Sequence, residues 1–253
     1  MKRLIISDLH IGSKHTNEES LVDFLSNIEC DELILAGDII DFIKIPQFTD
    51  KSRALFKIID NFNRRIIYII GNHDRSFQGL VGKEAFGVTF VDKYEFVDGK
   101  RKYRIEHGDK YEKGIVHWRF FMKLVSIIQD FMERYMDFDI STWYRNLISK
   151  KRKLRRIWDI VQWNEDADVF IMGHTHIPEV LIWVDENENI KTYANTGDWV
   201  DHQTYITVEN DVLRLKNWQL EKSERKESKR NSLSEQDRKS ASKIKNSNIL
   251  VTE

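Results

Sequence analysis

Residues 32–41 have the sequence ELILAGDIID, in which a short apolar run ends at a glycine and an aspartate. The run Glu32–Ala36 is rich in branched apolar side chains, which is typical of a strand buried on both faces of a sheet. The same order occurs upstream in RLIISDLH, residues 3–10, and downstream in RRIIYIIGNHD, residues 64–74. Each of these three candidate strands is therefore followed at once by aspartate, histidine or asparagine.

Helical patterns separate these three strands. Apolar residues recur at three- and four-residue spacing in Glu18–Ile28 and again in Ser52–Phe62, which is the period of an amphipathic helix. Strands that alternate with helices predict a parallel or mixed sheet covered by helices. Tyr103–Glu106 and Val169–Met172 resemble the first strands in composition and are predicted to be strands as well.

Hairpins are predicted in the second half of the chain. Asp98-Gly99 is a favourable turn between two apolar runs, and two further pairs of apolar runs enclose polar turns. The paired segments are Phe90–Val97 with Lys102–Glu106, Val180–Val184 with Ile190–Ala194, and Thr204–Val208 with Val212–Trp218. They predict a second, more antiparallel sheet packed on the first, so the fold class is α/β with α+β character.

The domain organisation follows from composition along the chain. With 253 residues, 41% of them hydrophobic, the chain can bury a large core. We assign residues 1–220 to one domain with a helical insertion at about 111–165. From Glu221 the sequence is rich in Lys, Glu, Ser and Arg, and we predict a disordered charged tail over residues 221–253.

Composition also argues against several classes of protein. The formal net charge of -1 gives no overall attraction to nucleic acid or membrane. The single cysteine, Cys30, cannot form an intramolecular disulfide, and we interpret it as a small buried apolar residue. Leu4–Ile6 is too short for a signal-peptide core, and no uncharged stretch approaches the roughly 20 residues of a membrane span. We therefore expect a cytoplasmic protein, soluble or peripheral on the inner membrane face.

Five short polar motifs each stand just after a candidate strand. They are Asp8-Leu9-His10, Gly37-Asp38-Ile39-Ile40-Asp41, Gly71-Asn72-His73-Asp74, His107-Gly108-Asp109 and Gly173-His174-Thr175-His176. Open α/β sheets build ligand sites at the carboxyl ends of their strands, so the motifs converge if these strands are neighbours. Carboxylate, amide and imidazole ligands suit Mn, Fe, Zn or Mg. In an extended segment Asp8 and His10 would share one side, as would His174 and His176.

A single histidine in such a motif is more often a hydrogen-bonded structural residue than a metal ligand. All five motifs in this order, after strands, favour a metal site instead. Asp74 and Asp109 have the simpler interpretation of capping turns, with orientation of a metal ligand as the alternative.

With these motifs, residues of about 1–218 resemble the calcineurin-like metallophosphoesterase superfamily. The resemblance implies a four-layer αββα sandwich with two divalent metal ions, for which Mn is a common choice and Fe, Zn or Mg are alternatives. It implies one ion bound by Asp8, His10, Asp38 and His176, and another bound by Asp38, Asn72, His107 and His174. Asp38 would bridge the two ions, and His73 would be the catalytic histidine with Asp41 as its partner.

Charge explains what such a centre can do. Two divalent ions about 3.5–4 Å apart lower the pKa of a water molecule between them and supply a nucleophile at neutral pH. His73 would stabilise the developing charge or protonate the leaving group. We therefore predict hydrolysis of a phosphodiester or pyrophosphate bond.

The helical insertion after His107-Gly108-Asp109 is similar to that of the UDP-2,3-diacylglucosamine hydrolase group, and Asn195–Trp199 resembles a segment of hydrolase-like relatives. This resemblance implies a nucleotide-linked lipid substrate whose acyl chains lie under a helical cap. That group often has arginine where this chain has His73. Apolar stripes within the insertion either contact acyl chains or pack into a helical hairpin.

Basic residues supply the candidate substrate contacts, namely Arg75, Lys150, Arg152 and Arg155. The run Lys150–Arg156 could face an anionic membrane surface or the substrate. It could equally be a solvated helix face or bind a nucleic-acid backbone.

Alternatives remain open within and beyond this superfamily. A nuclease or a cyclic-nucleotide phosphodiesterase would share the same metal motifs. Protein Ser/Thr phosphatases usually have Arg-Gly after the second aspartate of the GDxxD motif, whereas this chain has Phe42-Ile43. A non-catalytic scaffold of this fold would be expected to have lost ligands, and all are present here. No obligate protein partner is evident.

Overall fold

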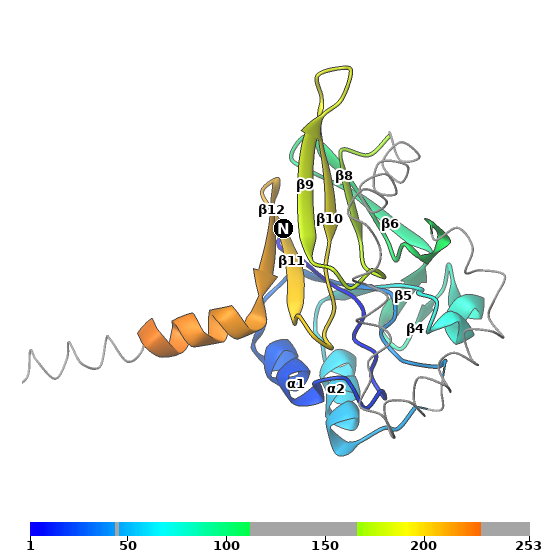
Figure 1. Cartoon of the computed structure of the whole chain (residues 1–253). Coiled ribbons are helices and arrows are strands. Elements are labelled where there is room, and N and C mark those ends of the chain that lie inside the picture. The colour runs from blue at the N-terminus through cyan, green and yellow to red at the C-terminus, as the bar shows by residue number, and fades with distance from the viewer. Residues whose placement is uncertain (44–45, 112–165, 229–253) are drawn as a thin grey trace, which may run out of the picture. The chain divides into compact units, whose positions relative to one another are not determined.

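The structure is a computed structural model that describes residues 1–43, 46–111 and 166–228 (Figure 1). Within these residues the chain forms a seven-stranded sheet and a five-stranded sheet. Met1–Leu215 are one compact unit and Lys216–Glu253 are a second. The predicted mixed α/β fold with two sheets is confirmed, whereas residues 112–165 of the predicted helical insertion lie outside the described residues.

The first sheet has the strand order β12-β11-β1-β2-β3-β5-β4. Its strands are β1 (Arg3–Ile6), β2 (Glu32–Ala36), β3 (Arg65–Ile69), β4 (Glu84–Ala85), β5 (Val88–Val91), β11 (Thr204–Glu209) and β12 (Val212–Asn217). β1, β2, β3 and β5 run parallel, with Ile34 opposite both Ile5 and Ile67. The strands β1, β2 and β3, which precede the first three motifs, are therefore neighbours, and their carboxyl ends lie along one edge of the sheet.

The second sheet has the strand order β6-β7-β8-β10-β9. Its strands are β6 (Lys93–Asp98), β7 (Arg101–Glu106), β8 (Val169–Met172), β9 (Glu179–Val184) and β10 (Ile190–Asn195). β8 pairs in parallel with β7 and with β10, while β6 and β9 complete the edges as antiparallel strands. The carboxyl ends of β7 and β8 are thus also neighbours.

Two details of the predicted second sheet were wrong. The β11–β12 hairpin joins the first sheet, where β11 pairs antiparallel with β1. Phe90–Val97 is two strands, since β5 ends at Val91 in the first sheet and β6 begins at Lys93 in the second. Alternating hydrophobicity reports which face of a strand is buried, but it does not identify the neighbouring strand.

The core between the sheets is made by alternate residues of the strands. Ile5, Ile34 and Ile67 from the first sheet and Tyr103, Ile105 and Ile171 from the second are all fully buried in one cluster. The intervening residues Leu4, Ile6, Leu33 and Leu35 are buried as well. Burial on both faces explains why these runs are continuously apolar rather than alternating.

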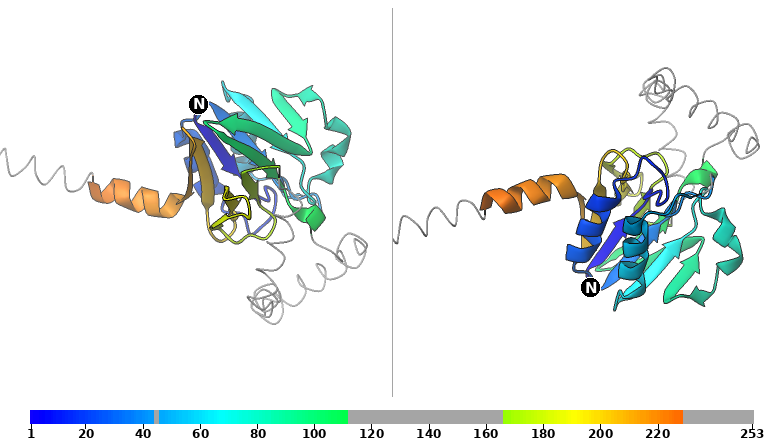
Figure 2. Two further views of the ribbon diagram at one scale, coloured as in Figure 1. Left: turned by 90° about the horizontal axis from the view of Figure 1, so that it is seen from above. Right: turned by 90° about the horizontal axis from the view of Figure 1, so that it is seen from below.

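Helices α1 (Glu18–Asn27) and α2 (Asp50–Asp60) lie side by side against the first sheet (Figures 1 and 2). Phe24 of α1 anchors this layer, with its ring centroid 4.8 Å from that of Tyr205 and 4.5 Å from that of Trp199. The Asn17 side chain caps α1 by accepting from the Ser20 N–H at 3.0 Å. Both predicted helices are present.

The outer face of the second sheet carries a separate apolar cluster. Tyr111, Phe170, Met172 and Tyr193 are buried there, with Leu181 and Trp183 packed against them. A four-layer sandwich requires helices on this face, and the segment predicted to supply them lies outside the described residues. The described residues contain three of these layers, namely the layer formed by α1 and α2 and the two sheets.

Residues 218–228 are helical, although the chain from Glu221 was predicted to be disordered. Glu221 forms an ion pair with Arg225 one turn later, at 3.6 Å, and another with Lys216 at 3.1 Å. Lysine, glutamate and arginine favour helices even where few apolar residues are available. Residues 229–253 lie outside the described part. No described helix is both long enough and apolar enough to span a membrane.

Candidate metal centre

The five motifs meet between the carboxyl ends of the two sheets. Three follow β1, β2 and β3 in the first sheet, and two follow β7 and β8 in the second. Backbone hydrogen bonds connect the loops, since the Asp8 N–H donates to Gly37 O at 3.0 Å and the Gly173 N–H donates to His107 O at 3.1 Å. The five motifs were expected to meet at the edge of one sheet, but they come from the edges of two sheets.

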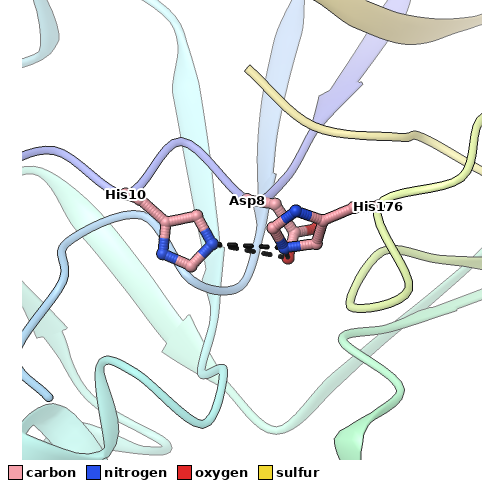
Figure 3. A group of neighbouring side chains, drawn as sticks. All are labelled: Asp8, His10 and His176. Atoms are coloured by element: carbon pink, nitrogen blue, oxygen red, sulfur yellow. Dashed lines mark hydrogen bonds and ion pairs between the residues drawn. The ribbon is translucent and has the colours of Figure 1, made fainter. Parts of the chain in front are cut away.

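Asp8, His10 and His176 form the first cluster (Figure 3). His176 Nε2 lies 3.1 Å from Asp8 Oδ1 and 3.3 Å from His10 Nε2. The other Asp8 oxygen, Oδ2, accepts from Ser7 Oγ and from the His174 N–H, the latter at 2.9 Å. One carboxylate oxygen is thus fixed by the protein, and the other faces two imidazole nitrogens.

Asp38, His107 and His174 form the second cluster, which Asn72 joins. His107 Nε2 lies 3.2 Å from Asp38 Oδ2 and 3.1 Å from Asn72 Oδ1. His107 Nδ1 lies 3.1 Å from the Ala36 carbonyl oxygen, which can only accept. Nδ1 therefore carries the hydrogen, and a neutral His107 presents its Nε2 lone pair to the cluster.

Asp38 connects the clusters. It shares one potential ligand group with His107 and His174, and another with His10 and His73. Its Oδ1 accepts from the His73 N–H at 2.8 Å, and the residue is 1% exposed. The seven predicted ligands all lie in the two clusters or between them, and a bridging role for Asp38 stays a prediction.

The donor set fits divalent metal ions. Asp8 Oδ1 is buried and, despite its closeness to His176, has no hydrogen-bond partner among the described residues. Unpartnered buried oxygens are costly, and a metal ion among Asp8, His10 and His176 would satisfy this one. The nitrogen and oxygen ligands match hard or borderline cations such as Mn, Fe, Zn or Mg.

The ligand-bearing backbone differs from the extended conformation expected for the two alternating pairs. Asp8, His10, Asp38, His174 and His176 all have positive φ, between 49° and 64°. Residues other than glycine rarely adopt this conformation, and it is concentrated at functional sites where the surrounding structure maintains it. Asp8 and His10 lie in the same cluster, whereas His174 and His176 lie in different ones. The prediction of an extended segment was therefore wrong for both pairs, because the backbone of these residues is not extended.

His73 and Asp41 form a dyad beside the clusters. His73 Nδ1 lies 2.9 Å from Asp41 Oδ1, and His73 Nε2 lies 3.8 Å from Asp38 Oδ2. Burial lowers the pKa of His73, but the Asp38 charge and the hydrogen bond to Asp41 outweigh burial and raise it. With Nδ1 directed at Asp41, His73 can carry a proton on Nε2, the nitrogen that faces the clusters.

Asp74 caps the turns around it, which is the structural role predicted from the sequence. Its carboxylate accepts from the N–H groups of Gly71 at 2.8 Å and Ile39 at 3.0 Å, and from Tyr68 Oη at 2.6 Å. It thereby fixes the loops after β2 and β3 to each other.

Asp198 and His202 were not predicted as part of the site. Asp198 Oδ2 lies 2.6 Å from His202 Nδ1 and 3.9 Å from Nδ1 of the candidate ligand His176. Asp198 is fully buried and also accepts from the Val200 N–H at 2.8 Å. In the sequence, Asn195–Trp199 is identified only by its resemblance to hydrolase-like relatives. A single aspartate in a loop has no spacing to other residues that would indicate a site.

Of the predicted substrate contacts, Arg75 is the one that the structure describes. Its side chain is 35% exposed and forms an ion pair with Asp109, which follows His107 by two residues. Lys150, Arg152 and Arg155 lie outside the described residues.

Metal binding is expected to strengthen as the pH rises from about 6 to about 9. Burial lowers the pKa of His107, but Asp38 outweighs burial and raises it to about 10. Burial also lowers the pKa of His176, but the charge of Asp8 outweighs burial and raises this pKa to about 9. Both imidazoles are therefore protonated in the metal-free protein at neutral pH, and each proton must leave when nitrogen binds a metal.

Calorimetric titration with MnCl2 at neutral pH, in buffers of different ionisation enthalpy, measures this proton release. Release of about two protons per chain is expected. Release of none, with an affinity independent of pH, would show that these histidines are not ligands.

Comparison with known proteins identifies the family of the chain. The family model for calcineurin-like phosphoesterases matches residues 1–178. The chain is 24% identical over 233 residues to the UDP-2,3-diacylglucosamine hydrolase of Vibrio cholerae serotype O1, covering 81% of this chain and 94% of that protein. It is 29% identical over 109 residues to the DNA polymerase II small subunit of Pyrococcus furiosus, covering 33% of this chain and 18% of that protein.

Solved structures give matches at lower identity. They include an archaeal phosphodiesterase, with a TM-score of 0.46, 15% identity, and coverage of 86% of this chain and 99% of that one. Yfce, a phosphoesterase from E. coli, has a TM-score of 0.46 and 16% identity, with coverage of 86% and 93%. The family model matches most of the chain, and residues 1–178 contain all five motifs. The chain belongs to the calcineurin-like phosphoesterase family, as a hydrolase of phosphate esters.

Proposed function

We propose that the chain is a dimetal hydrolase that cleaves a phosphodiester or pyrophosphate bond, with UDP-2,3-diacylglucosamine or a related nucleotide-linked lipid as its substrate. The observation that carries the dimetal part is the position of Asp38, which shares one potential ligand group with His107 and His174 and another with His10. The lipid part is supported by the Vibrio cholerae relative, whose similarity extends over 81% of this chain.

The residues of the chain have distinct roles in this proposal. Two divalent ions, when bound, would supply Lewis acidity and a water molecule of lowered pKa. Asp8, His10 and His176 would hold one ion, Asn72, His107 and His174 the other, and Asp38 both. Asp41 holds His73 by Nδ1, so a proton on His73 Nε2 would be available to the leaving oxygen of the substrate.

A lipid substrate also suits a protein that works at a membrane surface. We propose that Lys150–Arg156 contacts anionic lipid of the inner membrane face from the cytoplasmic side. Flotation with anionic liposomes tests this directly, since a charge-reversed Lys150–Arg156 variant should remain at the bottom of the gradient. Equal flotation of the two proteins would contradict the membrane contact.

Substrate assays in MnCl2 distinguish the candidate functions. We expect hydrolysis of UDP-2,3-diacylglucosamine to exceed that of bis(4-nitrophenyl) phosphate, cyclic nucleotides and single-stranded DNA, and to be lost in His73→Ala. Cleavage of DNA without cleavage of the pyrophosphate would replace the lipid function with a nuclease. Failure to bind two metal ions, with no hydrolysis of any of these substrates, would favour a non-catalytic scaffold.

A further inference from the structure

Arg75 is placed beside the metal centre by a rigid segment of backbone. It is the first residue of the 3-10 helix η1 (Arg75–Leu80) and directly follows Asp74. Asp74 is fully buried, and its carboxylate accepts from the N–H groups of Asp38 at 3.3 Å and Gly71 at 2.8 Å. The start of η1 is therefore fixed to the loop that carries the bridging carboxylate.

The Arg75 side chain is held from the opposite sheet. Its Nη2 donates to Asp109 Oδ2 at 2.6 Å, and Asp109 begins the short helix η2 (Asp109–Tyr111), two residues after His107. Arg75 thus joins the loop after β3 to the loop after β7, both of which carry candidate metal ligands. An arginine held from two sides loses less conformational freedom when it binds a further group.

Part of the guanidinium remains available. Among the described residues, Nε and Nη1 of Arg75 have no hydrogen-bond partner, and 35% of the side chain is exposed. Asp109 is 18% exposed. A guanidinium with N–H groups left over can donate two hydrogen bonds to the oxygens of a phosphate group.

We propose that Arg75 binds the second phosphate group of a diphosphate diester whose first phosphate lies at the two clusters, so that this residue selects pyrophosphate over single-phosphate substrates. The inference rests on the proposed phosphoester hydrolysis and specifies the class of substrate for that site. Asp109 is the positioning residue, since it orients Arg75 without covering it. A merely structural Arg75–Asp109 pair would connect two loops and would not distinguish between substrates.

The test compares two esters that differ by one phosphate group. These are bis(4-nitrophenyl) phosphate and P1,P2-bis(4-nitrophenyl) diphosphate, each assayed with the Mn-loaded protein. In Arg75→Ala the ratio of kcat/KM for the diphosphate to that for the monophosphate should fall about tenfold to a hundredfold, as expected for loss of charge-assisted hydrogen bonds. The change should lie mainly in KM, and Arg75→Lys should restore part of it.

Arg53→Ala is the matched control. Arg53 forms a similar pair with Asp50 at 2.9 Å on α2, but its side chain is 71% exposed and lies outside the five motifs. Metal content and thermal midpoint are measured for every variant. An unchanged ratio in Arg75→Ala would overturn the proposal, as would equal losses on both esters accompanied by loss of metal.

A binding measurement separates this inference from the proposed function. Methylenediphosphonate and methylphosphonate, which cannot be hydrolysed at the P–C bonds, are titrated into the Mn-loaded wild type and Arg75→Ala. Tighter binding of methylenediphosphonate that depends on Arg75 supports the inference even if the wild type hydrolyses neither ester, a result that would contradict only the proposed function. Equal preference in both proteins would overturn the inference whatever the activity.

Discussion

Replacement of Asp38 by asparagine is expected to lower kcat/KM for phosphoester hydrolysis by about a thousandfold or more, since each bound cation contributes several kcal/mol. Asp38 lies within both ligand groups and is almost completely buried. Asparagine keeps the shape and one oxygen but removes the negative charge and one metal-binding oxygen. The variant should therefore also bind fewer than two metal ions per chain.

Metal analysis and steady-state kinetics on the same preparation check this prediction. Asp60→Asn, at the exposed carboxyl end of α2, is the matched control and should behave as wild type. Circular dichroism shows whether both variants are folded. An Asp38→Asn protein with two bound metal ions and wild-type activity would rule out the bridging position.

Replacement of His73 by glutamine is expected to lower kcat by about a hundredfold to ten thousandfold while leaving the metal content intact, because proton transfer contributes that much. The loss should be greater for an alkyl ester than for a 4-nitrophenyl ester, since a good leaving group needs no proton. If His73 acted only through its backbone N–H to Asp38, which glutamine retains, neither ester would show a loss.

Asp41→Asn provides the matched test of the dyad. Burial lowers the pKa of His73, while Asp38 and the hydrogen bond to Asp41 raise it. Removing the Asp41 charge should therefore lower this pKa. If protonated His73 is the active form, activity is lost as the pH rises through its pKa, so the alkaline limb of the pH profile should move to lower pH. A limb that does not move would contradict the coupling.

Local features of the chain could be predicted from the sequence, and long-range ones could not. The runs before Asp8, Asp38 and Asn72 form the predicted parallel strands because burial on both faces leaves a continuous apolar signal. The partner of the β11–β12 hairpin and the passage between sheets at Asp92 depend on contacts far along the chain, which local periodicity does not record.

The candidate site divides in the same way. Its seven potential ligands stand in short motifs at strand ends, where their residue types and order are informative. The positive φ of Asp8 and His10 could not be inferred from the sequence. Glycine is the residue that usually indicates this conformation, and the Asp-Leu-His segment contains none. Asp198 was missed because its role depends on its approach to His176 from another loop.

Anomalous diffraction from crystals of the Mn-loaded protein tests the dimetal centre most directly. Two peaks about 3.5–4 Å apart are expected. One should lie among Asp8, His10 and His176, the other among Asn72, His107 and His174, and the Asp38 carboxylate should lie between them. A single peak, or two peaks that do not share Asp38, would contradict the two-metal account.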